Sequence, residues 1–149
     1  MRERMGDDRG ETLLEILVAV VLLGVAVVSV VGALLTTVQM SDLHRKQASA
    51  AATARDYAET VERRVAAGGY VSCATASAYL PAAVGFVPPA GYTATTTSVR
   101  YWTGSGWGAS CSADQGLQLA AVEVRSIDGR AVERSAVVLR RPCGQGSQC

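Results

Sequence analysis

The sequence predicts an α+β protein in which one long N-terminal α-helix packs on a small antiparallel β-sheet. The chain has 149 residues, enough for one domain at most. Between Thr12 and Ala67 there is no proline, and glycine occurs only at Gly24 and Gly32, so little interrupts a helix. Beyond Gly69 the composition becomes rich in threonine, valine and glycine, which is typical of strands and turns.

The first half of this helix is apolar enough to cross a membrane. The run from Ile16 to Leu35 carries no charged residue. At about 1.5 Å per residue it spans about 30 Å, the thickness of a bilayer's hydrocarbon core. It is longer than the apolar part of a secretory signal, and no A-x-A cleavage site directly follows it, so we expect a retained single span. Arg2, Arg4 and Arg9 favour a cytoplasmic N-terminus and an extracytoplasmic head.

The second half of the helix is predicted to be amphipathic. Its apolar residues recur at spacings of three, four and seven: Leu43, Ala50, Ala54, Tyr57, Val61 and Val65. This stripe indicates one helix face packed under a head. Gly68 and Gly69 give a stop signal. One helix of about 56 residues would be about 84 Å long, and the alternative is two helices broken near Thr36 and Thr37.

The head is predicted to be a three-stranded antiparallel sheet. Three segments have strand character: Tyr92–Trp102, Leu117–Ser126 and Arg130–Arg141. The proline-containing segment 71–90 is expected to be a connecting loop. In the second strand the apolar alternation slips at Ala120 and Ala121, which indicates a bulge there.

A tight hairpin is predicted between the last two strands. Asp128-Gly129 is a strong signal for a two-residue connection. With that register, Glu123 lies opposite Arg134 and the two form a cross-strand ion pair.

Four cysteines, Cys73, Cys111, Cys143 and Cys149, all follow the apolar run. None forms a C-x-x-C pair, and His44 is far from them in sequence, so the pattern disfavours a zinc site. Two disulfides in an oxidising compartment fit better. Three pairings are possible, and proximity favours Cys73–Cys111 with Cys143–Cys149.

No motif for catalysis, a cofactor or a metal ion is found, so we expect no enzyme. Asp114 and Asp128 lie in predicted turns, where aspartate is a turn former. Trp102 and Trp107 bracket a Gly-Ser-Gly turn and either pack at the core edge or form an exposed tip for a ligand. The net charge of +1, without a basic stripe interleaved with aromatic residues, predicts no nucleic-acid partner.

The segment Gly10–Glu15, read as G-E-T-L-L-E before the apolar run, resembles the type IV prepilin signature. That signature is shared by pilins and by the pseudopilins of type II secretion. The resemblance implies a leader at residues 1–10 that prepilin peptidase removes after Gly10, with Glu11 as the mature N-terminus and the site of N-methylation. Thr12 and Glu15 would then serve assembly. Two features depart from the pattern: Glu11 replaces the usual Phe or Met, and the leader is neutral.

Glu15 also has a physical reason of its own. A carboxylate within a membrane span costs about 2.5–3.5 kcal/mol at the helix centre and less near the edge. Cleavage after Gly10 creates a cationic amine about one helical turn from Glu15. The carboxylate can pair with that amine or with the amine of a neighbouring subunit, or it simply reaches headgroup water.

The resemblance further implies a pilin-like lollipop and a minor-pilin-like subunit of a type IV pilus or pseudopilus. Its domains would be a leader (1–10), a transmembrane half-helix (11–38), an amphipathic half-helix (39–69) and a disulfide-containing head (70–149). Its partners would be prepilin peptidase, other pilin or pseudopilin subunits, an inner-membrane assembly platform and the lipid bilayer. The alternatives are a single-pass anchored binding protein that never assembles and a secreted domain released by signal peptidase.

Overall fold

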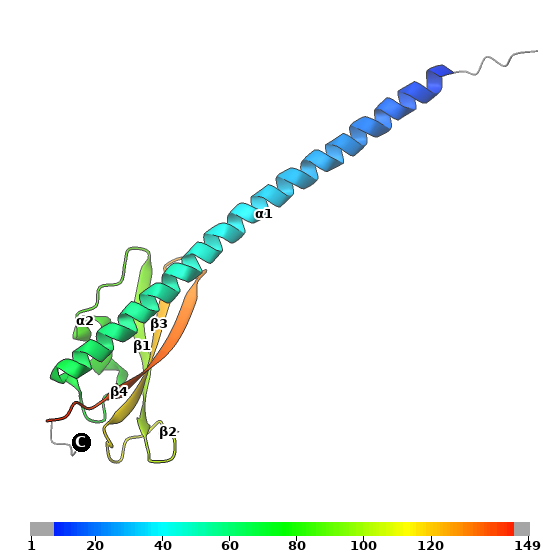
Figure 1. Ribbon diagram of the computed structural model, residues 1–149. Coiled ribbons are helices and arrows are strands. Elements are labelled where there is room, and N and C mark those ends of the chain that lie inside the picture. Colours follow the sequence, from blue (N-terminus) through cyan, green and yellow to red (C-terminus); the bar gives the residue numbers. More distant parts are fainter. Residues whose placement is uncertain (1–7, 145–149) are drawn as a thin grey trace, which may run out of the picture. The chain divides into compact units, whose positions relative to one another are not determined.

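The computed structural model describes residues 8–144, with side chains in the first helix from Leu13 onward. One α-helix, α1, runs from Asp8 to Arg64 without a break (Figure 1), so the single-helix prediction is confirmed. The hydroxyls of Thr36 and Thr37 donate to the carbonyls four residues earlier, at 2.9 Å each, and so do not compete with the helix. The helix ends in a π-helical turn, Val65–Gly69, in which Gly68 takes the left-handed φ of 93°.

The chain divides into two compact units, Met1–Asp42 and Leu43–Cys149. In the first unit, every residue from Leu13 to Met40 is exposed. Its most apolar 18-residue window has a mean hydropathy of 3.0. The described part of the chain therefore contains one helix, near the N-terminus, that is long and apolar enough to cross a membrane.

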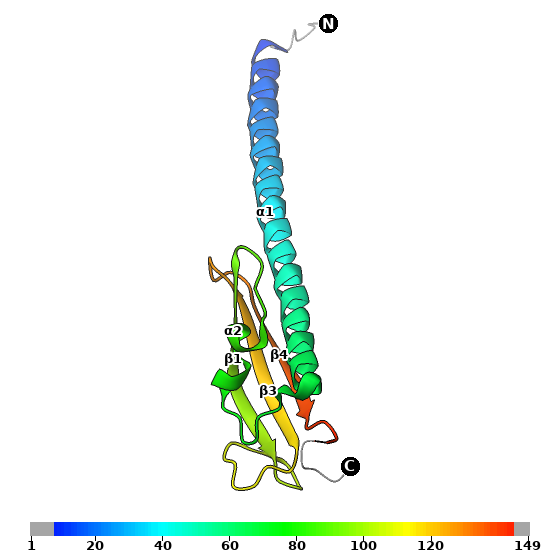
Figure 2. The same ribbon diagram turned by 90° about the vertical axis from the view of Figure 1, so that its left-hand side faces the viewer.

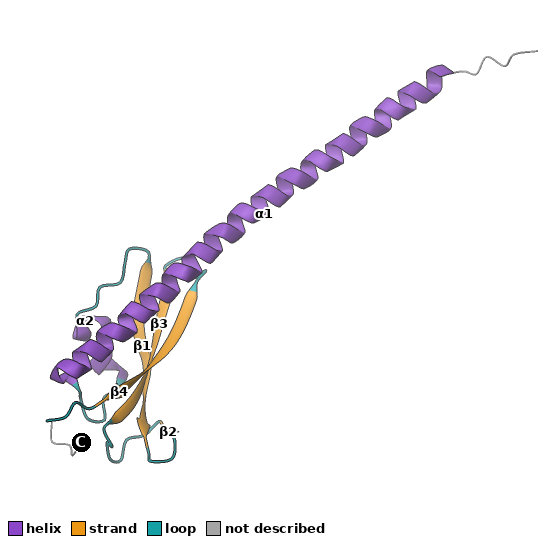
Figure 3. Ribbon diagram, viewed as in Figure 1, coloured by secondary structure: helices purple, strands orange, loops and turns teal. Residues whose placement is uncertain are grey.

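The second unit is an antiparallel sheet packed against the last part of α1 (Figures 2 and 3). Its strands are β1 (Tyr92–Trp102), β2 (Trp107–Gly108), β3 (Leu117–Ser126) and β4 (Val132–Arg140), in the order β2-β1-β3-β4. The α+β class is confirmed. The three predicted strands are present, and the two-residue β2 is an addition. The predicted loop 71–90 contains a 3₁₀ turn (Ala76–Tyr79) and a short helix, α2 (Pro81–Val84).

The predicted stripe of α1 forms one side of the core. Ala50, Ala54, Tyr57, Val61 and Val65 are buried, and Leu43 is half-buried. The other core residues come from the sheet, the β3–β4 connection and the 74–86 segment: Ala74, Tyr79, Val84, Phe86, Val99, Tyr101, Ala120, Val122, Val124, Ala131, Val137 and Leu139. Burying each larger apolar side chain stabilises the fold by about 1.5–3 kcal/mol, so this stripe is what fixes α1 on the sheet.

The bulge that was predicted at Ala120 and Ala121, in β3, is wrong. The register shift lies in β1, between Thr96 and Ser98, while β3 alternates without a slip. The alternation holds because Gln118 points inward and is fully buried, whereas the leucines on either side point outward. A buried glutamine is tolerated only where its amide finds partners, and Gln118 finds three.

The predicted register of the β3–β4 hairpin is confirmed, but the predicted two-residue connection is wrong, because residues 127–131 lie between the two strands. Gly129 takes a φ of 70°, and its amide donates to the Ser126 carbonyl at 2.8 Å. Glu123 lies opposite Arg134, and the guanidinium nitrogen is 2.7 Å from the carboxylate. The turn former Asp128 also accepts a hydrogen bond from Lys46 of α1 at 2.6 Å, which ties the hairpin to the helix.

Candidate functional site

The prepilin-like residues lie in the first turns of α1. Gly10, Glu11 and Thr12 fall within the helix, but their side chains are outside the described part of the structure. Glu15 is exposed and shares one helix face with Val18, Ala19 and Leu22. Its carboxylate therefore stands at one end of a continuous apolar surface.

The hydroxyl groups within the apolar part of α1 form hydrogen bonds to the backbone of the same helix. Ser29 donates to the Val25 carbonyl at 2.7 Å, in the same way as Thr36 and Thr37. Because no water is present in hydrocarbon, a spanning segment must satisfy its polar groups internally. This segment meets that condition at each of its hydroxyls.

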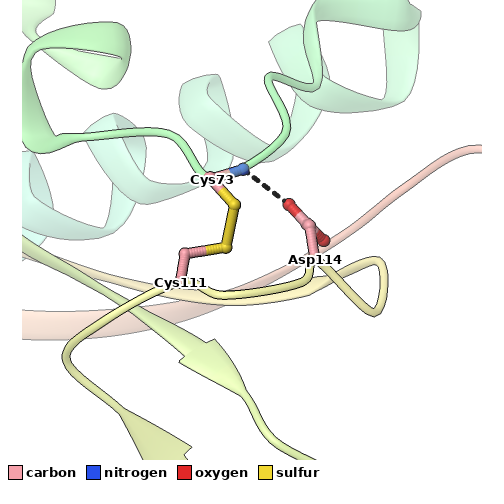
Figure 4. Close-up of side chains that lie close together, drawn as sticks. All are labelled: Cys73, Cys111 and Asp114. Carbon is pink, nitrogen blue, oxygen red and sulfur yellow. Dashed lines mark hydrogen bonds between the residues drawn. A yellow bond between two sulfur atoms is a disulfide. The ribbon is translucent and has the colours of Figure 1, made fainter.

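The head is crosslinked beside the end of α1. Cys73 and Cys111 form a disulfide with a Cα–Cα distance of 5.6 Å, which confirms that pairing (Figure 4). Cys143 is also disulfide-bonded. Its predicted partner, Cys149, lies outside the described residues.

A buried carboxylate lies directly beside this disulfide (Figure 4). The side chain of Asp114 is 4% exposed. It accepts hydrogen bonds from the Tyr70 hydroxyl and the Cys73 amide, at 2.7 Å each. The Gly116 amide donates at 2.6 Å and the Gln118 side-chain amide at 2.8 Å. Four donors from two distant segments therefore converge on one carboxylate.

A guanidinium completes this arrangement. Arg141, just after β4, lies 3.2 Å from the Asp114 carboxylate and 5.2 Å above the centre of the Tyr70 ring. It also donates to the Ser72 hydroxyl at 2.9 Å. We call Tyr70, Cys73, Asp114, Gly116, Gln118 and Arg141 the Asp114 cluster. The cluster joins the segment after α1, the loop before β3 and the segment after β4.

Gln118 extends the Asp114 cluster into the core. Its side-chain amide donates to the Val71 carbonyl at 2.9 Å, and its oxygen accepts from the Tyr79 hydroxyl at 3.1 Å. Among the described residues, no buried side-chain polar atom lacks a partner. A fully satisfied buried network of this kind specifies one packing of the loops against the sheet.

The hydrogen bonds also set the charge of Asp114. Burial alone would raise the pKa of its carboxyl, but donation from the Cys73 amide, Tyr70, the Gly116 amide and Gln118 outweighs burial and holds the pKa below its ordinary value. Burial, together with donation to Asp114, raises the pKa of the Tyr70 hydroxyl. At neutral pH the cluster therefore holds one carboxylate, one neutral phenol and one guanidinium.

Acid is expected to destabilise the head through this carboxylate. The pKa of Asp114 is lower in the folded chain than in the unfolded chain, so its stabilisation is fully present above the unfolded value, about 4, and is lost as the pH falls through the folded value. Unfolding midpoints in urea, measured from neutral pH down to about pH 2, should stay level and then fall below about pH 4. Asp114→Asn should show a shallower fall, and an equally steep one would contradict the role of this group.

The disulfide and the neighbouring carboxylate, Cys73, Cys111 and Asp114, do not form a metal site. The sulfur atoms of Cys73 and Cys111 and a carboxylate oxygen of Asp114 lie within 4.8 Å of one another. Both sulfurs are bonded to each other, and the carboxylate is filled by its donors. A metal ion would need thiolates and free oxygen lone pairs, neither of which is available here.

Asp114 was predicted to be a turn former. It does form a turn, but the sequence did not predict its contacts with the rest of the Asp114 cluster. Its bond to the Gly116 amide closes that turn. One signal in the sequence pointed to the role of Asp114 as a buried hydrogen-bond acceptor. Between Val65 and Val122 the only charged residues are Arg100 and Asp114. A single carboxylate in so uncharged a stretch is a candidate for a buried, bonded group.

Comparison with known proteins adds no relative to this description. Neither family models, nor curated proteins, nor solved structures match the chain.

Proposed function

We propose that this chain is a membrane-inserted, prepilin-like structural subunit, cleaved after Gly10 and assembled into a type IV pilus or a type II secretion-type pseudopilus. The observation that carries the proposal is the build of α1. One unbroken helix contains the G-E-T-L-L-E segment, exposes an apolar surface from Ile16 to Val38 whose hydroxyls bond to the helix backbone, and then buries a stripe against a sheet. It would be a substrate of prepilin peptidase and not itself an enzyme.

In this proposal α1 crosses the cell membrane once, with a cytoplasmic N-terminus and an extracytoplasmic head. The disulfides support an oxidising location for the head. Glu15 neutralises the new amine of its own chain or of a neighbouring subunit, which sets the register of copies packed through their apolar helices. Thr12 and Glu15 are thus the assembly residues, and Glu11 is the residue open to N-methylation.

Processing gives the direct test. Co-expression with an active prepilin peptidase should yield a mature chain whose N-terminal sequence and intact mass begin at Glu11. Gly10→Ala should abolish this processing, because the residue before the scissile bond is the more exacting position of the signature. Gly6→Ala, a matched change within the leader, should leave it intact.

Three results would be decisive against the proposal. A mature chain that keeps Met1 beside a working peptidase would support an anchored protein that does not assemble. A start beyond Leu35 would indicate release by signal peptidase. Equal processing of Gly10→Ala and wild type would show that the cleavage site is assigned wrongly.

A further inference from the structure

The sheet has a second face, which points away from α1 and from the core. Its residues alternate with the buried ones along the strands. On β1 they include Thr93, Thr95, Arg100 and Trp102; on β3, Leu117, Leu119, Ala121, Glu123 and Arg125; on β4, Arg134, Ala136, Val138 and Arg140. We call this set, with Trp107 of β2, the outer face. None of these residues is buried, and Val138 is 50% exposed.

The outer face is strongly biased towards positive charge. It carries four arginines and one acid, Glu123. Glu123 is shared, because Arg134 lies 2.7 Å and Arg125 lies 3.1 Å from its oxygens. Arg100 and Arg140 form no ion pair with any residue that the structure describes. Two guanidiniums of the outer face are therefore available to an anionic partner.

Both tryptophans of the chain lie on this same face. Trp102 pairs across the sheet with Trp107, and their rings meet edge to face with centroids 5.5 Å apart. Both are half-exposed. Trp102 lies two residues along β1 from Arg100, so an aromatic surface adjoins a free cation.

The register fixes the spacing of the two free cations. Arg100, Leu119 and Val138 form one row across three strands, and Leu117 pairs with Arg140 in the next row on this face. Two strand spacings and one two-residue step along the strands place Arg100 and Arg140 about 12 Å apart at their backbones. Leucines lie between them, so the cations border an apolar strip.

We propose that the outer face binds single-stranded nucleic acid. Arg100 and Arg140 pair with backbone phosphates, for which a planar guanidinium is well shaped. Bases stack on Trp102 and Trp107, and such stacking tolerates any sequence because every base has a π-face. An open sheet face with exposed aromatic residues and free arginines suits an extended strand with its bases turned outward, whereas the paired bases of a duplex present no ring faces.

The sequence alone gives no sign of this surface. Its arginines and tryptophans are scattered between Arg100 and Arg140, without a basic run. Only the pairing of β1, β2, β3 and β4 brings them together. The inference does not depend on cleavage or assembly, so it stands or fails separately from the proposed subunit role.

Intrinsic fluorescence gives a specific assay, because the chain's two tryptophans both lie at the proposed site. The full chain in neutral detergent is titrated with a single-stranded oligodeoxyadenylate of about 12 nucleotides. We expect saturable quenching and a binding constant that falls with salt. With Arg100 and Arg140 engaged, the slope of log K against log salt should be about −1.4.

The double variant Arg100→Gln/Arg140→Gln should weaken binding at least about tenfold at low salt and reduce that slope by about 1.4. The matched control is Arg55→Gln/Arg64→Gln, which removes the same charge from the exposed surface of α1 and should bind as the wild type does. Circular dichroism of both variants checks that the fold is kept.

The inference is overturned if the oligonucleotide leaves tryptophan fluorescence unchanged, or if the Arg100 and Arg140 variant binds like the control. Equal affinity for a duplex of the same length would remove the role of base stacking. Equal affinity for heparin would indicate an acidic polysaccharide as the partner.

Discussion

Asp114→Asn is expected to lower the free energy of unfolding of the head by about 3–5 kcal/mol, the usual cost of removing one partner from a buried ion pair. The substitution keeps the size of the side chain but replaces an oxygen acceptor with an amide donor. The carboxylate is 4% exposed and Arg141 is 18% exposed, so solvent cannot replace the lost contacts. Urea unfolding of the full chain in detergent, followed by tryptophan fluorescence, measures the change.

A surface aspartate provides the control for that measurement. Asp56 on α1 lies 4.0 Å from Arg63, but its side chain is 66% exposed. Asp56→Asn should therefore change stability by less than about 0.5 kcal/mol. If Asp114→Asn behaves like Asp56→Asn, the Asp114 cluster does not hold the loops as argued. A double-mutant cycle with Arg141→Met should show a double variant less destabilised than the sum of the singles.

Loss of the Cys73–Cys111 disulfide is expected to cost about 4 kcal/mol. The two cysteines are 38 residues apart, and closing a loop of that length restricts the unfolded chain by roughly this amount. Cys73 also holds a left-handed φ of 51°, and its amide donates to Asp114. Removing the crosslink therefore loosens the Asp114 cluster as well.

The variant Cys73→Ser/Cys111→Ser keeps side-chain size and tests this crosslink. Ser112→Ala, an exposed change in the same loop, should alter stability by less than about 0.5 kcal/mol. Without reductant, the urea midpoint of the double variant should lie well below that of the wild type. A midpoint equal to that of the wild type would mean that the disulfide does not stabilise the head.

Much of the fold was readable because it depends on local, periodic patterns. The absence of proline up to Ala67 predicted one helix, and the apolar stripe from Ala50 to Val65 predicted its buried face. Asp128-Gly129 predicted the hairpin, which in turn set Glu123 opposite Arg134. These signals act within a few residues, so a sequence displays them directly.

The errors came from contacts between distant residues. The apolar alternation of the second strand was expected to slip at Ala120 and Ala121. In the structure β3 alternates regularly with Gln118 facing the core, because Asp114, Val71 and Tyr79 supply its partners. β3 therefore needs no bulge, and the register shift lies in β1, between Thr96 and Ser98. Tertiary hydrogen bonds here outweigh the apolar pattern, and no local rule reports them.

The candidate site, too, was predicted from the sequence only in part. The Cys73–Cys111 pairing was favoured on proximity and is confirmed. The roles of Gly10, Glu11, Thr12 and Glu15 rest on a resemblance and stay predictions. The Asp114 cluster and the outer face were not predicted, because their members are joined only by strand pairing and by loop packing.

The tie between Lys46 and Asp128 has a consequence for biosynthesis. The two residues are 82 positions apart, and Ala50 and Ala54 likewise pack on Val124 and Ala131. At about 5–20 residues per second, the ribosome takes roughly 4–16 seconds to deliver the covering strands after the helix has emerged. Throughout that interval the buried stripe of α1 is bare and exposed to aggregation. A nascent chain stalled before β4 would remain in that open condition, because Val137 and Leu139 of β4 complete the core.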